Sequence, residues 1–150
     1  MSIDISEKNG MQEIILDKKG MELEIIGNFH VKGTEKKEIS LRIVHKVPST
    51  KASVKFHGVV EDSAFLKITG TIVVEKQAQQ TQSFLREKIL LLSPSAKAEA
   101  IPNLEILAND VKCSHAASIT KINEDQLFYL MSRGLSQKQA EQEIVKGFLA

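Results

Sequence analysis

Apolar and polar residues alternate in short segments along most of the first 122 residues. These segments are rich in Val, Ile, Thr and Phe, and their period of two is typical of β-strands. The breaks between them carry Gly, Pro, Ser, Asn and Asp, which favour turns. The pattern predicts strands over residues 21–31, 39–47, 52–60, 64–75, 83–92, 101–108 and 111–119.

No segment before residue 122 shows a convincing helical period. Residues 76–84 are the most ambiguous, because their polar sequence fits either a helical turn or a polar connection. The strands follow one another at roughly regular spacing, as in a β-solenoid, but no clean sequence repeat is present. Residues 1–122 are therefore predicted to form a mainly β core, and a solenoid, a sandwich or a barrel would fit this pattern.

The pattern changes to a helical one after Ile122. Asn123 followed by two acidic residues predicts a helix start, and Gly134 predicts its end. Ser136, with Gln139 three residues later, predicts the start of a second helix. Its apolar face contains Ala140, Ile144, Val145 and Phe148. Residues 123–150 are thus expected to form a short helical hairpin, which must dock on the β core or on a partner because each helix is short.

The composition narrows the classes of partner. The chain has 150 residues and a formal net charge of +1, with no Trp and one Tyr, so neither a basic field nor a base-stacking surface for nucleic acid is expected. No segment reaches transmembrane length and no signal peptide is visible, so no membrane partner is expected. A single cysteine without a secretion signal indicates a reduced, cytoplasmic protein.

The only cysteine lies two residues before a histidine, in the predicted strand over residues 111–119. A period of two places Cys113 and His115 on one face, where they could bind Fe or Zn or act as nucleophile and base. A packed thiol with an incidental strand-edge histidine is the commoner outcome. Two ligands are also too few for a complete metal site, and Glu99 and Glu105 are candidate auxiliary ligands. His30, His45 and His57 are expected at the surface or at strand edges, and no enzyme motif is present.

Several short motifs together resemble the SufB/SufD family of iron–sulfur cluster assembly proteins. They are "LLLS" at 90–93, "IPNLEI" at 101–106, "DVKCSH" at 110–115, "LFYLMSRGLS" at 127–136 and "GF" at 147–148. The resemblance covers residues 45–149 of a family whose members are longer, and implies a short, truncated member. It also implies a right-handed parallel β-helix with a helical C-terminal segment. Ala96 and Ala116 stand where SufB typically has a cysteine and a glutamate, so the chain is closer to SufD.

The resemblance implies a non-catalytic SufD-like component of cluster assembly, acting as a scaffold or in iron delivery. Cys113 and His115 would bind iron or an iron–sulfur cluster transiently, at the edge of a homodimer or of a dimer with a SufB-like chain. A SufC-like ATPase would bind the helical tail, for which the candidate contact residues are Leu127, Tyr129, Leu130, Arg133 and Phe148. The alternative is a structural or regulatory binding module that kept the fold but lost the cluster chemistry.

Overall fold

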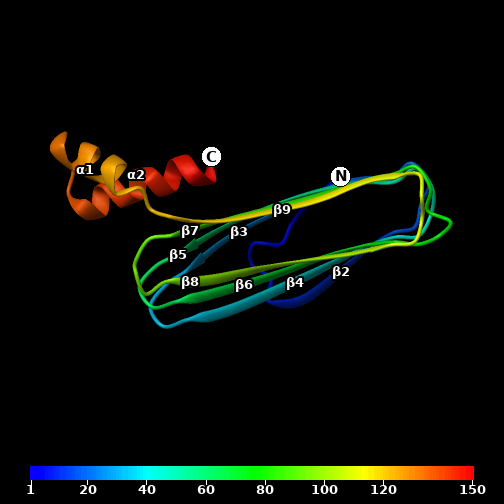
Figure 1. Cartoon of the computed structure of the whole chain (residues 1–150), viewed down its shortest axis with the longest axis horizontal. Coiled ribbons are helices and arrows are strands. Elements are labelled where there is room, and N and C mark those ends of the chain that lie inside the picture. The colour runs from blue at the N-terminus through cyan, green and yellow to red at the C-terminus, as the bar shows by residue number, and fades with distance from the viewer.

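The chain winds through nine strands that form two facing parallel sheets, and the computed structural model describes all 150 residues (Figure 1). One sheet has the order β1-β3-β5-β7-β9 and the other β2-β4-β6-β8, so successive strands alternate between the sheets. The strands are β1 (Ser2–Asp4), β2 (Gly10–Leu16), β3 (Glu22–Val31), β4 (Lys36–His45), β5 (Lys51–Val60), β6 (Phe65–Val74), β7 (Thr81–Leu91), β8 (Lys97–Ile106) and β9 (Val111–Lys121). The result is a β-solenoid of about four turns.

Each coil of the solenoid stacks in register on the coil before it. Ile25 pairs with Val54, Val54 with Leu85, and Leu85 with His115, all in parallel ladders. The turns that join the sheets also stack, because Gly33 N–H donates a 2.9 Å hydrogen bond to the Asp62 carboxylate of the next coil. This register means that a residue in one coil has the same orientation as its partner in the next.

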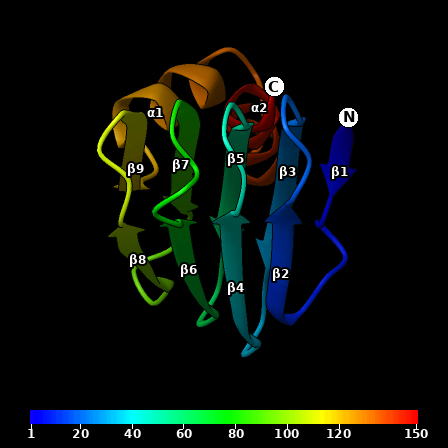
Figure 2. The ribbon, with the colours of Figure 1, turned by 90° about the vertical axis from the view of Figure 1, so that its right-hand side faces the viewer.

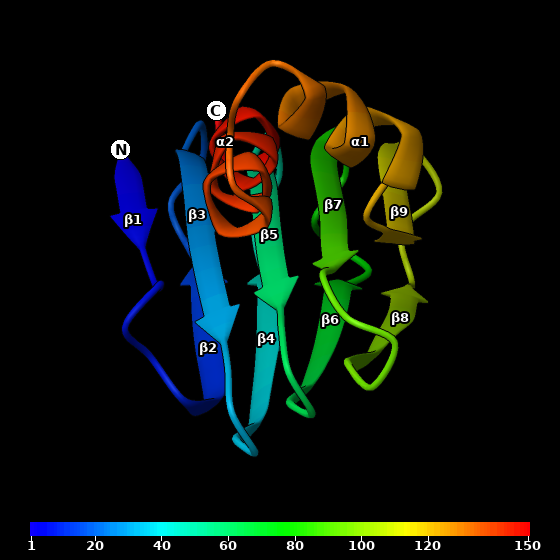
Figure 3. The ribbon, with the colours of Figure 1, turned by 90° about the vertical axis from the view of Figure 1, so that its left-hand side faces the viewer.

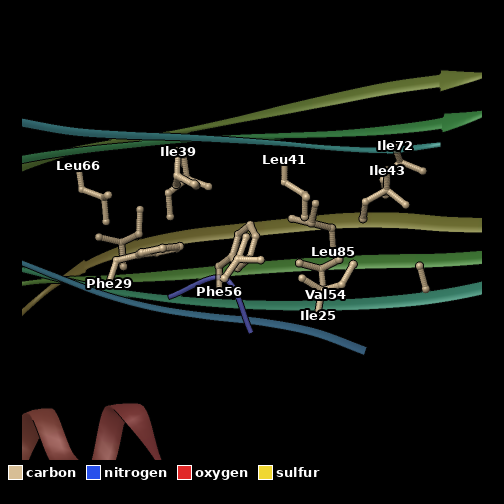
Figure 4. Packing of buried hydrophobic residues seen from close by; sticks show 14 of the residues in the cluster. Ile25, Phe29, Ile39, Leu41, Ile43, Val54, Phe56, Leu66, Ile72 and Leu85 are labelled. Atoms are coloured by element: carbon tan, nitrogen blue, oxygen red, sulfur yellow. The ribbon is translucent and has the colours of Figure 1, made fainter. Parts of the chain in front are cut away.

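Apolar side chains fill the space between the two sheets. Ile25, Val54 and Leu85 point from one sheet toward Leu41 and Ile43 of the other (Figure 4). Phe29 of β3 and Phe56 of β5 pack edge to face in the space between the sheets, with ring centroids 5.7 Å apart. Burying one such side chain contributes about 1.5–3 kcal/mol, so the stacked coils share one continuous core.

The last coil leaves the C-terminal end of the solenoid open. β9 pairs only with β7 and β8 only with β6, so each has one free edge. Ile119 and Leu104 continue the inward-facing ladders, yet they are 42% and 48% exposed. Unpaired strand edges and uncovered apolar residues are typical of a surface that pairs with another chain.

Two helices follow the last strand and lie at one end of the coils, on the outer side of the sheet that contains β3, β5 and β7 (Figures 1, 2 and 3). They are α1 (Glu124–Ser132) and α2 (Gln137–Leu149). The Asn123 side chain caps α1, and Ser136 and Gln139 form the predicted capping box of α2. α2 packs on β5, and the outward-facing residues Val59 and Leu90 on this side are buried.

The predicted fold class, a mainly β parallel solenoid followed by a helical hairpin, is confirmed. The sequence pattern did not resolve β1 and β2, and it began β4 and β8 several residues too late. Of the two interpretations of residues 76–84, the polar connection is correct, since a turn leads directly into β7. Neither helix is long and apolar enough to cross a membrane.

Candidate functional site

Cys113 and His115 both face the solenoid interior from the last strand, as the period of two predicts. Cys113 is in register with Ser83 and His115 with Leu85, while the residues beside them are exposed. Burial raises the pKa of the Cys113 thiol above its usual value, and a hydrogen bond with the Ser83 backbone opposes that shift in part. The thiol is therefore not pre-activated in the isolated chain.

His115 has a close acidic neighbour that sequence reasoning missed. Its Nε2 atom lies 3.4 Å from Oε2 of Glu87 on β7, and the two side chains are 2% and 0% exposed. Neither the carboxylate oxygens nor the ring nitrogens form a hydrogen bond with any group of the chain. Burial raises the pKa of the Glu87 carboxyl, and His115 opposes this shift.

Gly70 on the opposite sheet provides the room for this pair. A Cβ atom at Gly70 would lie 2.9 Å from Glu87 Oε1 and 3.1 Å from His115 Cε1. It would also lie 2.6 Å from a methyl group of Leu85, closer than van der Waals contact allows. A larger residue at this position would therefore displace the buried pair or its supporting leucine.

The two auxiliary glutamates point away from Cys113 and His115. Glu99 is exposed between Ala98 and Ala100, which pack against the core. Glu105 lies on the outer face, where its carboxylate is 3.6 Å from the Arg42 guanidinium. No three His, Cys, Asp or Glu side chains converge on one point. The single chain thus brings Glu87, rather than Glu99 or Glu105, to His115.

The other histidines lie apart from this pair, and the prediction for His45 is wrong. It is fully buried, with Nδ1 2.8 Å from the Thr50 hydroxyl and Nε2 2.9 Å from the Ser83 hydroxyl. Burial lowers its pKa to about 4. His30 pairs with a glutamate at the surface. His57 packs edge to face on Phe148, and burial and nearby lysines lower its pKa.

The candidate partner-binding residues of the tail divide into two groups. Phe148 packs on His57 and so fastens α2 to the solenoid, with ring centroids 5.5 Å apart. Tyr129 lies exposed on α1, and its hydroxyl accepts hydrogen bonds from Arg133 at 3.1 and 3.2 Å. Leu127 and Leu130 are half-buried, while Phe128 and Met131 of α1 are exposed. The free apolar surface of the tail is therefore on α1.

A polar surface groove lies elsewhere, between α2 and the turns that follow β3 and β5. It has a volume of about 800 Å³. Ten of the 12 residues that line it are polar or charged, among them His30, Glu61 and Lys146. The groove does not include Cys113, Glu87 or His115, so it is separate from the candidate site.

The fold and the site define a class: a parallel β-solenoid that presents a thiol and an imidazole in its last, open coil, next to a buried carboxyl of the coil before it. Residues 5–148 match the SufBD core domain of the SUF system for FeS cluster assembly. The chain belongs to this SufBD family.

Curated relatives agree with this assignment. The chain is 34% identical over 119 residues to the iron–sulfur cluster assembly protein SufD of Bacillus subtilis, covering 79% of this chain and 27% of that protein. It is 36% identical over 143 residues to an iron–sulfur cluster assembly SufBD family protein of Pyrococcus horikoshii, covering 95% and 28%. The identity to SufD of Escherichia coli is 39% over 92 residues, covering 61% and 22%. The chain spans about a quarter of the length of these relatives.

Proposed function

We propose that this chain is a non-catalytic, SufD-like subunit of iron–sulfur cluster assembly, which acts as a scaffold or in iron delivery. The observation that carries the proposal is the position of Cys113 and His115, which share the inward face of the last, open coil. A thiolate and an imidazole are the ligands that iron and its clusters use in proteins. Iron or the cluster would be the cargo of the subunit.

The free edge of β9 supports a dimer as the working form. Two protein ligands leave a tetrahedral site incomplete, and no further ligand in this chain converges on Cys113 and His115 together. Pairing of this edge with the same edge of a second copy, or with a SufB-like chain, would bring a second set of ligands to the site. The exposed Ile119 and Leu104 would be covered in the same step.

The exposed residues of α1 support binding of a SufC-like ATPase. Phe128 is 74% and Tyr129 54% exposed, on a helix that packs mainly against α2. Aromatic residues at this exposure are typical of protein interfaces. The names of the relatives say that they act in iron–sulfur cluster assembly, and we extend that process to this chain. We also propose a cytoplasmic location, because a single cysteine is typical of a reducing compartment.

A role without catalytic turnover agrees with the state of Cys113. A nucleophilic cysteine requires a lowered pKa or an adjacent base held by a third group. Burial instead raises the pKa of Cys113, and the side chain paired with His115 is Glu87 on the neighbouring strand. The thiol is thus suited to become a ligand when a metal replaces its proton.

Anaerobic reconstitution with ferrous iron and sulfide, followed by visible absorbance, tests this function. The wild-type chain should gain the charge-transfer bands of a bound cluster, and Cys113→Ser with His115→Ala should lose them. Ser114→Ala is the matched control, because Ser114 lies between the two ligands but is exposed. A double variant that still binds a full cluster would contradict the proposal.

The alternative is a binding module without cluster chemistry. It predicts that a purified SufC-like ATPase still binds the chain through α1, although the wild-type protein gains no cluster in the reconstitution. Phe128→Ala with Tyr129→Ala should abolish that binding, since both side chains are exposed on α1. Binding to SufC together with an absence of cluster would therefore select the alternative.

A further inference from the structure

The chain contains two close histidine–glutamate pairs, and they differ in geometry. At the surface, His30 Nε2 and Glu61 Oε2 are 2.7 Å apart and form a hydrogen bond. In the interior, His115 Nε2 and Glu87 Oε2 are 3.4 Å apart and form none. Imidazole–carboxylate hydrogen bonds are normally about 2.7–3.2 Å long. The interior pair is therefore a contact between two ionisable groups that is longer than a normal hydrogen bond.

The interior pair also leaves polar atoms without partners where water is excluded. Both carboxylate oxygens of Glu87 and both ring nitrogens of His115 are buried and form no hydrogen bond. Burying such a group without a partner costs about 1–3 kcal/mol, and more for a charged group. Buried carboxylates and imidazoles that lack hydrogen bonds are commonly metal ligands.

The 3.4 Å separation fits two ligands of one metal ion. Metal–ligand distances of about 2.0–2.2 Å in a tetrahedron place two donor atoms about 3.3–3.6 Å apart. We propose that Glu87 and His115 bind a divalent first-row transition metal cation, such as Fe²⁺ or Zn²⁺, between the last two coils of the solenoid. This site makes Glu87 an additional ligand and, resting on the proposed function, gives the place where iron first binds to the chain.

Small or exposed residues lie around the pair. Gly70 lies opposite, where a Cβ atom would approach both Glu87 and His115. In the coil above, Ala117 is in register with Glu87 and Pro102 with Gly70, and both are exposed. One layer of small or open positions thus separates the carboxylate from the free end of the solenoid.

The donor set indicates the class of cation. One carboxylate oxygen and one imidazole nitrogen suit borderline metals such as Fe²⁺ and Zn²⁺ better than Mg²⁺ or Ca²⁺, which prefer oxygen ligands. The remaining positions on the metal are open to water or to a group from a second chain. A cation held here would lie on the face from which Cys113 also projects.

Titration of the metal-free chain with Co²⁺ tests the site, because tetrahedral Co²⁺ has strong visible bands. The wild-type chain should bind one Co²⁺ that Zn²⁺ and anaerobic Fe²⁺ displace. Glu87→Gln keeps the size of the side chain and should weaken the affinity at least tenfold, as should His115→Ala. Glu99→Gln is the matched control, an exposed glutamate on β8 of the other sheet, and should bind as the wild type does.

A second measurement separates loss of binding from loss of folding. Co²⁺ should raise the melting temperature of the wild type and of Glu99→Gln but not that of Glu87→Gln, whose metal-free melting temperature should not fall. Gly70→Ala should weaken Co²⁺ binding as well, since its methyl group occupies the space around the pair. Equal Co²⁺ affinity in Glu87→Gln and the wild type would overturn the proposal.

The same variants distinguish this site from the proposed function. If the wild-type chain binds Co²⁺ through Glu87 but gains no cluster with iron and sulfide, the metal site stands and the cluster function fails. If Glu87→Gln binds Co²⁺ and gains a cluster as the wild type does, the function stands and this inference is wrong.

Discussion

Two histidines lie inside the solenoid, and they differ in whether the chain provides hydrogen-bond partners for their ring nitrogens. His45 is fully buried at the end of β4, and both of its ring nitrogens are within hydrogen-bond distance of hydroxyl groups, those of Thr50 and Ser83. The His115 side chain is 2% exposed, and neither ring nitrogen has a hydrogen-bond partner. The two histidine side chains are buried to nearly the same extent. Burial alone therefore does not separate a structural histidine from a functional one.

The position along the solenoid explains the difference. His45 has a coil on each side of it, since Leu16 and Val74 flank it in the ladder. A group enclosed in this way must find partners within the chain. His115 lies in the last coil, beside a free edge, where a metal or a second chain can still supply the missing partner. The unsatisfied histidine is therefore the better candidate for a site.

The largest effect is expected from replacing His45. His45→Ala removes a fully buried ring and leaves the hydroxyls of Thr50 and Ser83 without their partner. A cavity and two orphaned polar groups together should lower the free energy of unfolding by about 4 kcal/mol. Urea denaturation at pH 7.5, followed by far-UV circular dichroism, measures this loss.

His115→Ala is the comparison for that variant, because its ring makes no hydrogen bond that would be lost. It should lower the free energy of unfolding of the metal-free chain by clearly less than His45→Ala does. Equal losses in the two variants would mean that both histidines are structural.

The second effect is a dependence of stability on pH through His45. Burial lowers its pKa from 6.5 to about 4 in the folded chain. Between these values the unfolded chain binds a proton that the folded chain does not. Stability is thus complete above pH 6.5 and falls as the pH drops toward 4, by about 3 kcal/mol.

Urea denaturation at pH 7.5 and at pH 4.5 measures this slope. In His45→Ala the difference between the two pH values should shrink by about 2 kcal/mol or more, because the group that causes it is gone. An unchanged slope would assign the pH dependence to other groups.

Much of the fold was visible in the sequence, and the reason for the gaps is physical. Strand alternation and the capping residues Asn123 and Ser136 are local signals, and the structure confirms both. The repeat is hidden because one turn, with positive φ, is formed by Gly20, Ser49 and Gln80 in successive coils. The same backbone conformation recurs at this turn although the residue type changes, so the sequence shows no clean repeat.

The candidate site was only partly predictable for a similar reason. Alternation put Cys113 and His115 on one face, but the partner of His115 comes from the previous coil and depends on register. Glu87 did carry a signal, since it occupies an inward position between the buried Leu85 and Ile89. A charged residue at an apolar position of a strand is expensive to bury. Glu87 could therefore have been named from the sequence as a candidate site residue.

The third effect is a small change in the free energy of unfolding when Glu87 is replaced. Its sign is opposite to that expected for His45→Ala. Glu87→Gln replaces a buried carboxyl, which makes no hydrogen bond, with a neutral amide of similar size. Relief of the desolvation cost should leave the free energy of unfolding of the metal-free chain unchanged or raise it by about 1 kcal/mol. Urea denaturation of the chelator-treated protein at pH 7.5 measures it. A loss comparable to that of His45→Ala would show that Glu87 is a structural residue.

The smallest effect is expected at the surface pair of His30 and Glu61. The two atoms are 2.7 Å apart, the shortest contact of any His–Glu pair in the chain, but the side chains are 40% and 31% exposed. Water competes for both groups, so such pairs contribute about 0–1 kcal/mol. His30→Ala should therefore lower the free energy of unfolding by less than about 1 kcal/mol at pH 7.5 and leave Co²⁺ binding unchanged. A loss well above 1 kcal/mol in His30→Ala would show that the short distance between these two groups outweighs the competition from water.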